Sequence, residues 1–149
     1  MLFRSEPGTP AGWQRILEAR RQLIAAGAHL LAPCPHAAAC PIQAPDWCHF
    51  SRRVARSRSH RLAKGGAVPW EDEKFSYLAV SRRLGELPAA RVIAPAQTRS
   101  SQVALKLCTG EGQAVERHWS KRDGEAFKKA RRLEWGDAFD DCLRDSLKG

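Results

Sequence analysis

The segment from residue 31 to residue 50, LAPCPHAAACPIQAPDWCHF, concentrates side chains that bind metals: Cys34, Cys40, Cys48, His36 and His49. Thiolates and imidazoles are common ligands of zinc, and thiolates hold iron–sulfur clusters. The four prolines of this segment oppose regular structure and reduce the entropy that is lost when the three sulfurs converge. We therefore expect a cysteine-rich metal-binding loop at residues 31–50, with the histidines beside the metal or at the surface. Buried thiols without a metal are the alternative.

The spacing of the cysteines bears on the kind of metal. The intervals are C-x5-C and C-x7-C, which are wider than the about two to four residues typical of a zinc finger. Wide spacing suits an iron–sulfur cluster, whose ligands approach from several directions and which needs a fourth thiolate. Cys108 is the better candidate because it ends a predicted strand, whereas Cys142 lies in the charged tail. The spacing alone leaves zinc and an iron–sulfur cluster open.

Cysteine number and the first residues bear on the cell compartment. The chain has five cysteines, and the start MLFRSEPGTP lacks the apolar core of a secretory signal. We expect a reducing compartment, the cytosol or an organelle matrix, where disulfides are disfavoured. No uncharged apolar run of about 18 residues occurs, so no membrane span is predicted. The length of 149 residues suits a single domain over residues 1–149.

Basic residues outnumber acidic ones by 25 to 16, which gives a formal net charge of +9. A polyanion such as RNA is a natural partner for such a chain. The charge is densest in a basic segment, residues 51–64, which has no acidic residue and carries Arg52, Arg53, Arg56, Arg58, Arg61 and Lys64. Phosphate contact is the functional interpretation, because the forked donors of arginine match phosphate oxygens. A solvated helix face is the alternative.

The hydrophobic pattern of the first third predicts alternating strands and a helix. Thr9 is the expected N-cap of a helix over residues 10–26. Short strands are expected before it, at residues 1–5, and after it, at residues 28–32, so that the three elements form a parallel βαβ unit. The EPGTP turn and the cysteine-rich loop would then lie at the same edge of the sheet, where ligands collect.

The remaining pattern predicts mostly strands. Asp46 is a candidate cap for a helix that begins near Trp47. The later strands are expected at residues 73–83, 91–96, 102–108 and 114–121, and the last three would form a consecutive antiparallel group. A basic amphipathic helix is predicted over residues 124–135.

Several motifs occur here in one order: EPGTPAG, APCPH followed by a second cysteine and CP, DWCHF, EDEKFSYL, a cysteine that ends a late strand, and ARRLEWGD. In these residues the chain resembles the C-terminal half of the ribosomal small-subunit methyltransferase-like family, whose members include bacterial proteins and mitochondrial small-ribosomal-subunit assembly factors. The resemblance runs from about residue 5 to about residue 137. It implies an α/β, partial class I (Rossmann-like) methyltransferase fold with a cysteine-rich loop insertion and a C-terminal antiparallel strand group.

The resemblance also implies a ligand set, a cofactor and a partner. The family's [4Fe–4S] site would map onto Cys34, Cys40, Cys48 and Cys108, and the partner would be the small ribosomal subunit or its rRNA. S-adenosylmethionine binds such methyltransferases at a glycine-rich loop after the first strand, and this chain has no such loop. We therefore expect the chain to be inactive alone and to need a separate N-terminal half for methyl transfer.

The predicted function is thus an iron–sulfur, methyltransferase-like protein that acts in ribosome assembly or translation, in the bacterial cytoplasm or the mitochondrial matrix. The alternative is a non-catalytic, zinc-stabilised nucleic-acid-binding module.

Overall fold

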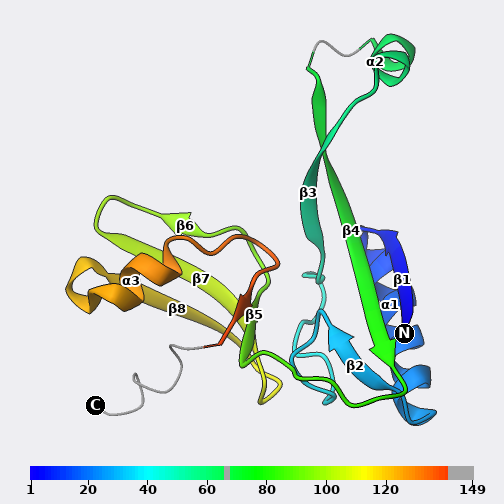
Figure 1. Ribbon diagram of the computed structural model, residues 1–149, viewed down its shortest axis with the longest axis horizontal. Coiled ribbons are helices and arrows are strands. Elements are labelled where there is room, and N and C mark those ends of the chain that lie inside the picture. The colour runs from blue at the N-terminus through cyan, green and yellow to red at the C-terminus, as the bar shows by residue number, and fades with distance from the viewer. Residues whose placement is uncertain (66–67, 141–149) are drawn as a thin grey trace.

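The computed structural model describes residues 1–65 and 68–140 and shows a mixed α/β chain with two antiparallel sheets (Figure 1). The first sheet carries one helix on its face and extends into a long two-stranded arm. The second sheet follows in the chain and lies beside the base of the arm. The cysteine-rich loop lies between the two sheets, so that both contribute residues to its surroundings.

The first sheet has four strands: β1 (Leu2–Pro7), β2 (His29–Ala32), β3 (Phe50–Ala55) and β4 (Trp70–Ser81). Each of the other three pairs antiparallel with β4, which lies between β1 and β2. Strands β1 and β2 therefore run in the same direction but do not pair with each other. The predicted parallel βαβ pairing is wrong, because the long strand β4 occupies the place between them. No parallel pair occurs among the described strands, so a Rossmann-like sheet is not confirmed.

Helix α1 (Pro10–Ala25) starts where the sequence predicts and ends one residue earlier. The Thr9 side chain accepts a hydrogen bond from the Gly12 N–H at 3.1 Å, as expected of an N-cap. Gly27 follows the helix with φ of +79°, a left-handed conformation that glycine adopts without strain. The apolar face of α1 packs on the first sheet through a compact core cluster: Ile16, Leu30, Leu78 and Val80.

The turn between β1 and α1 packs so closely on its neighbours that two of its positions require glycine. A Cβ atom on Gly8 would lie 2.7 Å from the backbone of Lys74 in β4, and one on Gly12 would lie 2.0 Å from the Pro7 carbonyl oxygen. Both distances are well inside van der Waals contact. The two glycines of the EPGTPAG motif therefore allow α1 to start directly against the end of β1.

Strands β3 and β4 form the arm, which projects away from the rest of the chain and carries helix α2 (Arg58–Lys64) at its tip (Figure 1). The Ser57 side chain caps α2 by accepting from the His60 N–H at 3.2 Å. The predicted helix near Trp47 is wrong. Asp46 Oδ1 does accept from the Trp47 N–H, but the following residues enter strand β3, because β4 offers them a full antiparallel register.

The second sheet has five strands: β5 (Ala90–Val92), β6 (Gln97–Thr98), β7 (Gln102–Thr109), β8 (Ala114–Ser120) and β9 (Ala138–Phe139). Strand β7 pairs antiparallel with β5, β6 and β8, which confirms the predicted antiparallel group. A 3₁₀ turn, η1 (Lys121–Asp123), leads into helix α3 (Glu125–Ala130). Helix α3 ends earlier than predicted, since a tight turn follows in which the Asp137 carboxylate accepts from the Glu134 N–H at 2.8 Å.

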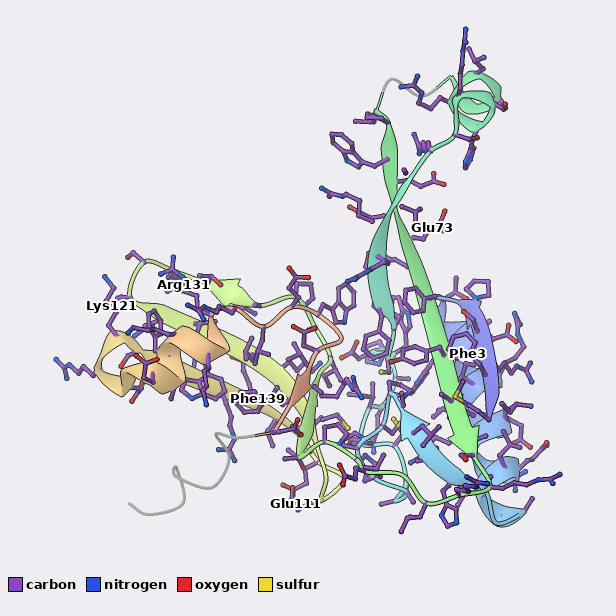
Figure 2. All side chains as sticks on the ribbon, viewed as in Figure 1. Phe3, Glu73, Glu111, Lys121, Arg131 and Phe139 are labelled. Atoms are coloured by element: carbon purple, nitrogen blue, oxygen red, sulfur yellow. The ribbon has the colours of Figure 1, made fainter. Side chains whose placement is uncertain are left out.

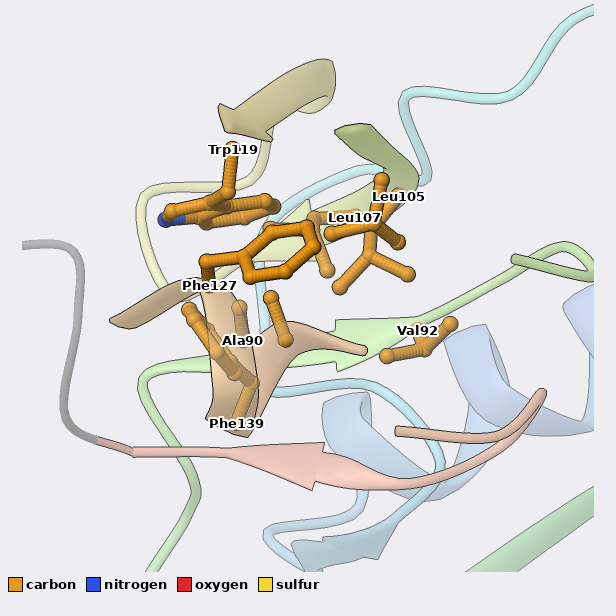
Figure 3. Packing of buried hydrophobic residues seen from close by; sticks show 9 residues of the cluster. Ala90, Val92, Leu105, Leu107, Trp119, Phe127 and Phe139 are labelled. Atoms are coloured by element: carbon orange, nitrogen blue, oxygen red, sulfur yellow. The ribbon is translucent and has the colours of Figure 1, made fainter. Parts of the chain in front are cut away.

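The second sheet has its own core, separate from the cluster under α1. Trp119 of β8 and Phe127 of α3 pack in one cluster with Leu105 and Leu107 of β7 and Phe139 of β9 (Figure 3). Leu107 and Val92 are fully buried. This core fixes β7, and therefore the backbone that carries Cys108, against the cysteine-rich loop.

Candidate metal centre

The four predicted cysteine ligands line one cavity. Cys34, Cys40 and Cys48 come from the loop between β2 and β3, and Cys108 comes from β7 in the other sheet. All four are free thiols, of which Cys108 is buried and the others are partly buried. The cavity is small, with a volume of about 30 Å³, and most of the surface that lines it is apolar. Yellow sulfur atoms are visible in this region between the two sheets (Figure 2).

Hydrogen bonds tie the cysteine-rich loop to both sheets. The Ser76 hydroxyl of β4 donates to the Cys48 carbonyl oxygen at 2.8 Å, and Trp47 Nε1 donates to the Gly8 carbonyl oxygen at 3.0 Å. Arg91 of β5 donates from Nε to the Pro33 carbonyl oxygen at 2.8 Å. The Trp47 bond brings the loop into contact with the EPGTP turn, but the predicted shared edge of a parallel sheet is wrong, because β1 and β2 lie on opposite sides of β4.

His36 and Cys108 are in direct contact across the junction of the two sheets. His36 Nε2 lies 3.3 Å from Cys108 Sγ, and both residues are buried. With its proton on Nε2, the ring donates a hydrogen bond to the sulfur, and His36 Nδ1 then has no hydrogen-bond partner. Burial and the nearby charge of Arg20 lower the pKa of His36, which favours the neutral ring.

Arg20 is a functional candidate that the sequence analysis missed. Its guanidinium lies on the cavity wall, and the residue is only 6% exposed. Nη2 donates to the carbonyl oxygens of His36 at 2.8 Å and Ala38 at 2.7 Å, whereas Nε is buried and has no hydrogen-bond partner. The signal was present in the helix pattern, because Arg20 follows Trp13 and Ile16 at helical spacing and so lies on the apolar face of α1.

Burial raises the pKa of Cys34, Cys48 and Cys108 at the cavity. The pKa of Cys108 rises to about 12, because of burial first and the nearby Cys34 and Cys40 second. The pKa values of Cys34 and Cys48 are also raised, chiefly by burial. The positive charge of Arg20 opposes the rise at Cys34 and Cys108. The thiols thus share a poorly solvated site, where converting them all to thiolates requires a compensating cation.

The side chains are not arranged as a cage for one ion. Within residues 1–65 and 68–140, no group of three or more His, Cys, Asp or Glu residues is placed to hold a single metal ion. The four thiols instead surround a cavity from different directions. The fifth cysteine, Cys142, lies outside the described residues.

The basic segment is divided between strand β3 and helix α2. Two of its arginines pair with acids of β4: Arg53 lies 2.8 Å from Asp72, and Arg56 lies 2.7 Å from Glu71. Arg53 also lies over the ring of Trp70, with its guanidinium carbon 5.6 Å from the ring centroid. These ion pairs hold the two strands of the arm together, and they make Arg53 and Arg56 poorer candidates for phosphate contact than the sequence predicts.

The other arginines of the segment are less constrained. In the described part of the chain, Arg52, Arg58 and Arg61 have no ion-pair partner. Arg58 and Arg61 lie on α2 at the tip of the arm, together with the exposed side chain of Leu62. The side chain of Lys64 lies outside the described residues. Figure 2 shows side chains projecting from both sides of the arm around the labelled Glu73.

The fold and the four-thiol cavity define a mixed α/β protein with a candidate metal centre at the junction of two sheets and a basic arm. A family model described as mitochondrial small ribosomal subunit Rsm22 matches residues 1–140. The chain belongs to this methyltransferase-like family, which is associated with the small ribosomal subunit. No curated protein matches the chain. The match confirms the predicted ribosomal family, whereas the correspondence to a C-terminal half stays a prediction.

The sequence predicts no membrane span. In agreement, none of the described helices is both long enough and apolar enough to cross a membrane.

Proposed function

We propose that this chain is a [4Fe–4S] protein that associates with the small ribosomal subunit or its rRNA, in the mitochondrial matrix, and acts in ribosome assembly or translation. The observation that carries the proposal is the convergence of four free thiols, from two distant parts of a chain of this family, on one poorly solvated cavity. Four thiolates around one space are the ligand set of such a cluster.

The resemblance to a family whose [4Fe–4S] site maps onto these four cysteines favours a cluster over a single zinc ion. Zinc holds its thiolates at about 2.3 Å, so that their sulfurs lie only about 3.8 Å apart in a tetrahedron. A cuboidal cluster of iron and sulfide spreads its four ligands over a wider span. In the described residues the four thiols line one cavity and do not form a single-ion cage, and iron, sulfide and zinc analysis separates the two centres.

The chain's own residues prepare the site for a metal. His36 provides a buried hydrogen-bond donor for the Cys108 sulfur, and hydrogen bonds to Cys48 and Pro33 fix the two ends of the loop. The protons of the thiols leave when the metal binds, so that loading is favoured by higher pH. When bound, the cluster would link the loop to β7 through iron–sulfur bonds. The centre therefore has a structural role, which is to fix the second sheet relative to the arm.

The arm is the proposed rRNA contact. It follows directly after Cys48, so that a centre that orders the loop also orders the base of β3. Arg52, Arg58 and Arg61, which form no ion pair in the part of the chain that the structure describes, supply positive charge to phosphates. The chain lacks a glycine-rich loop for S-adenosylmethionine after its first strand. We infer that any methyl transfer requires a separate N-terminal half that binds S-adenosylmethionine.

The experiment is anaerobic purification of the full chain, followed by iron, acid-labile sulfide and zinc analysis. The cluster predicts a brown protein with about four irons and about four sulfides per chain. Four single Cys→Ala variants, at residues 34, 40, 48 and 108, should lose iron and colour. Cys142→Ala is the matched control, since it removes the fifth cysteine and should leave the iron content unchanged.

The same analysis tests the alternative. A colourless protein with one zinc per chain would favour a zinc-stabilised nucleic-acid-binding module and would overturn the cluster. Loss of iron in Cys142→Ala, with retention in Cys108→Ala, would show that the ligand set is wrong.

A further inference from the structure

The charge of Arg20 is buried without a carboxylate to balance it. Arg20 is 6% exposed, and its side chain forms no ion pair among the described residues. A buried charge without a counterion destabilises the folded chain. The two carbonyl oxygens of His36 and Ala38 offset part of this cost, but Nε is buried without any partner. The described residues that line the cavity include no carboxylate, so the groups there that can become negative near Arg20 are chiefly the thiols.

Arg91 brings a second positive charge to the same cavity from the opposite sheet. Its Nε donates to the Pro33 carbonyl oxygen at 2.8 Å, and its Nη1 donates to the Gly136 carbonyl oxygen at 3.0 Å. Its side chain lines the cavity together with Arg20 and the four cysteines. Among the described residues both arginines donate hydrogen bonds to backbone carbonyls, and neither pairs with a carboxylate. Both positive charges can therefore be balanced by a negatively charged group bound in the cavity.

We infer that Arg20, assisted by Arg91, is the charge partner of the metal centre and sets its reduction potential and stability. This inference rests on the proposed cluster and goes beyond it, since it assigns two positioning residues that are not metal ligands. Four thiolates around a [4Fe–4S] core in its 2+ state carry two net negative charges, which two guanidinium groups balance. Reduction by one electron adds a further negative charge, and a nearby positive charge stabilises the reduced form.

A purely structural role for Arg20 gives a different expectation. Its two hydrogen bonds to the loop carbonyls both come from Nη2 and brace residues 36 and 38, and that bracing depends on the length and planar shape of the side chain as well as on its charge. Lysine in its place keeps the charge on a shorter side chain of different shape, whereas methionine keeps an unbranched stem but loses the charge. The two substitutions therefore separate the two roles.

The test uses the full chain loaded anaerobically with iron and sulfide, as wild type and as Arg20→Met, Arg20→Lys, Arg91→Met and Arg21→Met. Arg21→Met is the matched control, because Arg21 lies next to Arg20 in α1 but is exposed and pairs with Glu18. The readouts are the midpoint potential, from a dithionite titration followed by electron paramagnetic resonance, and the rate of iron loss to a chelator.

We expect Arg20→Met to shift the midpoint potential to more negative values and to speed iron loss roughly 10–100-fold. Arg91→Met should shift the potential in the same direction by less. Arg20→Lys should keep a potential close to that of the wild type while losing iron faster, and Arg21→Met should behave as the wild type.

Two results would overturn the inference while leaving the cluster in place: unchanged potentials in Arg20→Met and Arg91→Met, or equal shifts in Arg20→Lys and Arg20→Met. If Arg20→Met fails to load, Arg91→Met decides, since a negative shift supports the inference and no shift overturns it. A wild-type chain that takes up no iron overturns the proposed cluster and the inference together.

Discussion

His36 Nε2 lies 3.3 Å from Cys108 Sγ, although 72 residues separate the two in the chain. The contact joins the cysteine-rich loop to β7 at the place where the four thiols meet. A histidine of a Cys/Pro-rich loop would ordinarily be assigned to the surface, but His36 is buried as deeply as the cysteine it contacts. Depending on the ring tautomer, Nε2 donates a hydrogen bond to the Cys108 sulfur or accepts one from the thiol.

His36→Ala should therefore weaken the junction even without a metal. Removal of a buried hydrogen bond and the ring that makes it should lower the free energy of unfolding of the metal-free chain by about 1–3 kcal/mol. The measurement is urea unfolding of the reduced, metal-free protein. His118→Ala is the control, because His118 is exposed on β8 and should change stability by less than about 0.5 kcal/mol. Equal effects of the two substitutions would contradict the role of His36.

The raised thiol pKa values predict a loss of stability at high pH in the metal-free chain. The pKa of Cys108 is about 12, because of burial and the nearby Cys34 and Cys40, whereas an unfolded cysteine has a pKa of about 8.5. Between these values the unfolded thiol loses its proton and the folded one keeps it, so unfolding is favoured as the pH rises. Stability is fully present below about pH 8.5 and should fall steadily above it.

Cys108→Ala isolates this pH effect. One such thiol contributes a slope of at most about 1.4 kcal/mol per pH unit in its window. In urea unfolding at pH values from about 7.5 to about 10.5, the variant should therefore show a shallower decline than the wild type. Parallel pH profiles for the two proteins would show that the Cys108 thiol ionises normally in the folded chain.

Gly12→Ala should destabilise the chain although alanine is the better helix former. Alanine in place of glycine contributes about 1 kcal/mol to an ordinary helix. Here the added Cβ would lie 2.0 Å from the Pro7 carbonyl oxygen, and a backbone atom cannot swing aside as a side chain can. The steric cost should win, with a net loss of about 1–3 kcal/mol in thermal or urea unfolding.

The shift of α1 in Gly12→Ala should also displace Arg20, so iron uptake should fall. Gly110→Ala is the control, since a Cβ there would lie at an ordinary 3.4 Å from the Ala89 carbonyl oxygen. A Gly12→Ala variant that is more stable than the wild type would show that the turn can relax at no cost.

Local signals in the sequence predicted much of the fold. Thr9, Pro10 and Gly27 marked both ends of α1, and the turn residues between the runs marked β7 and β8. Strand order was not predictable in the same way, because nothing in residues 1–32 shows that β4, which begins only at Trp70, inserts between β1 and β2. The secondary structure of the basic segment was hard to predict for a related reason. Residues 50–55 form a strand because they pair with β4, which also carries the acidic partners of Arg53 and Arg56.

The candidate site was predictable in part. The loop cysteines were apparent from their proximity in the chain. Cys108 was singled out because it ends a predicted strand, the resemblance implied the same ligand, and the structure places it at the same cavity. Arg20 and Arg91 were missed because an arginine on a helix or strand usually faces water. Only its helical spacing from Trp13 and Ile16 distinguished Arg20, because that spacing places it on the apolar face of the helix. A charged residue in such a pattern is easily taken for a break in the apolar face rather than for a buried site residue.

The arginines of the arm fall into two groups, those that pair with an acid and those that form no ion pair among the described residues. Neutralising two of the second group, as Arg58→Gln with Arg61→Gln, should weaken binding to a small-subunit rRNA fragment. It should also reduce the slope of log affinity against log salt by about 0.7–0.9 for each phosphate that the arm no longer neutralises. Arg53→Gln with Arg56→Gln removes the same charge, but those side chains already pair with Asp72 and Glu71, so it should change the slope less. The measurement is fluorescence anisotropy at several salt concentrations, and a larger effect of the paired group would reverse the assignment of the contact surface.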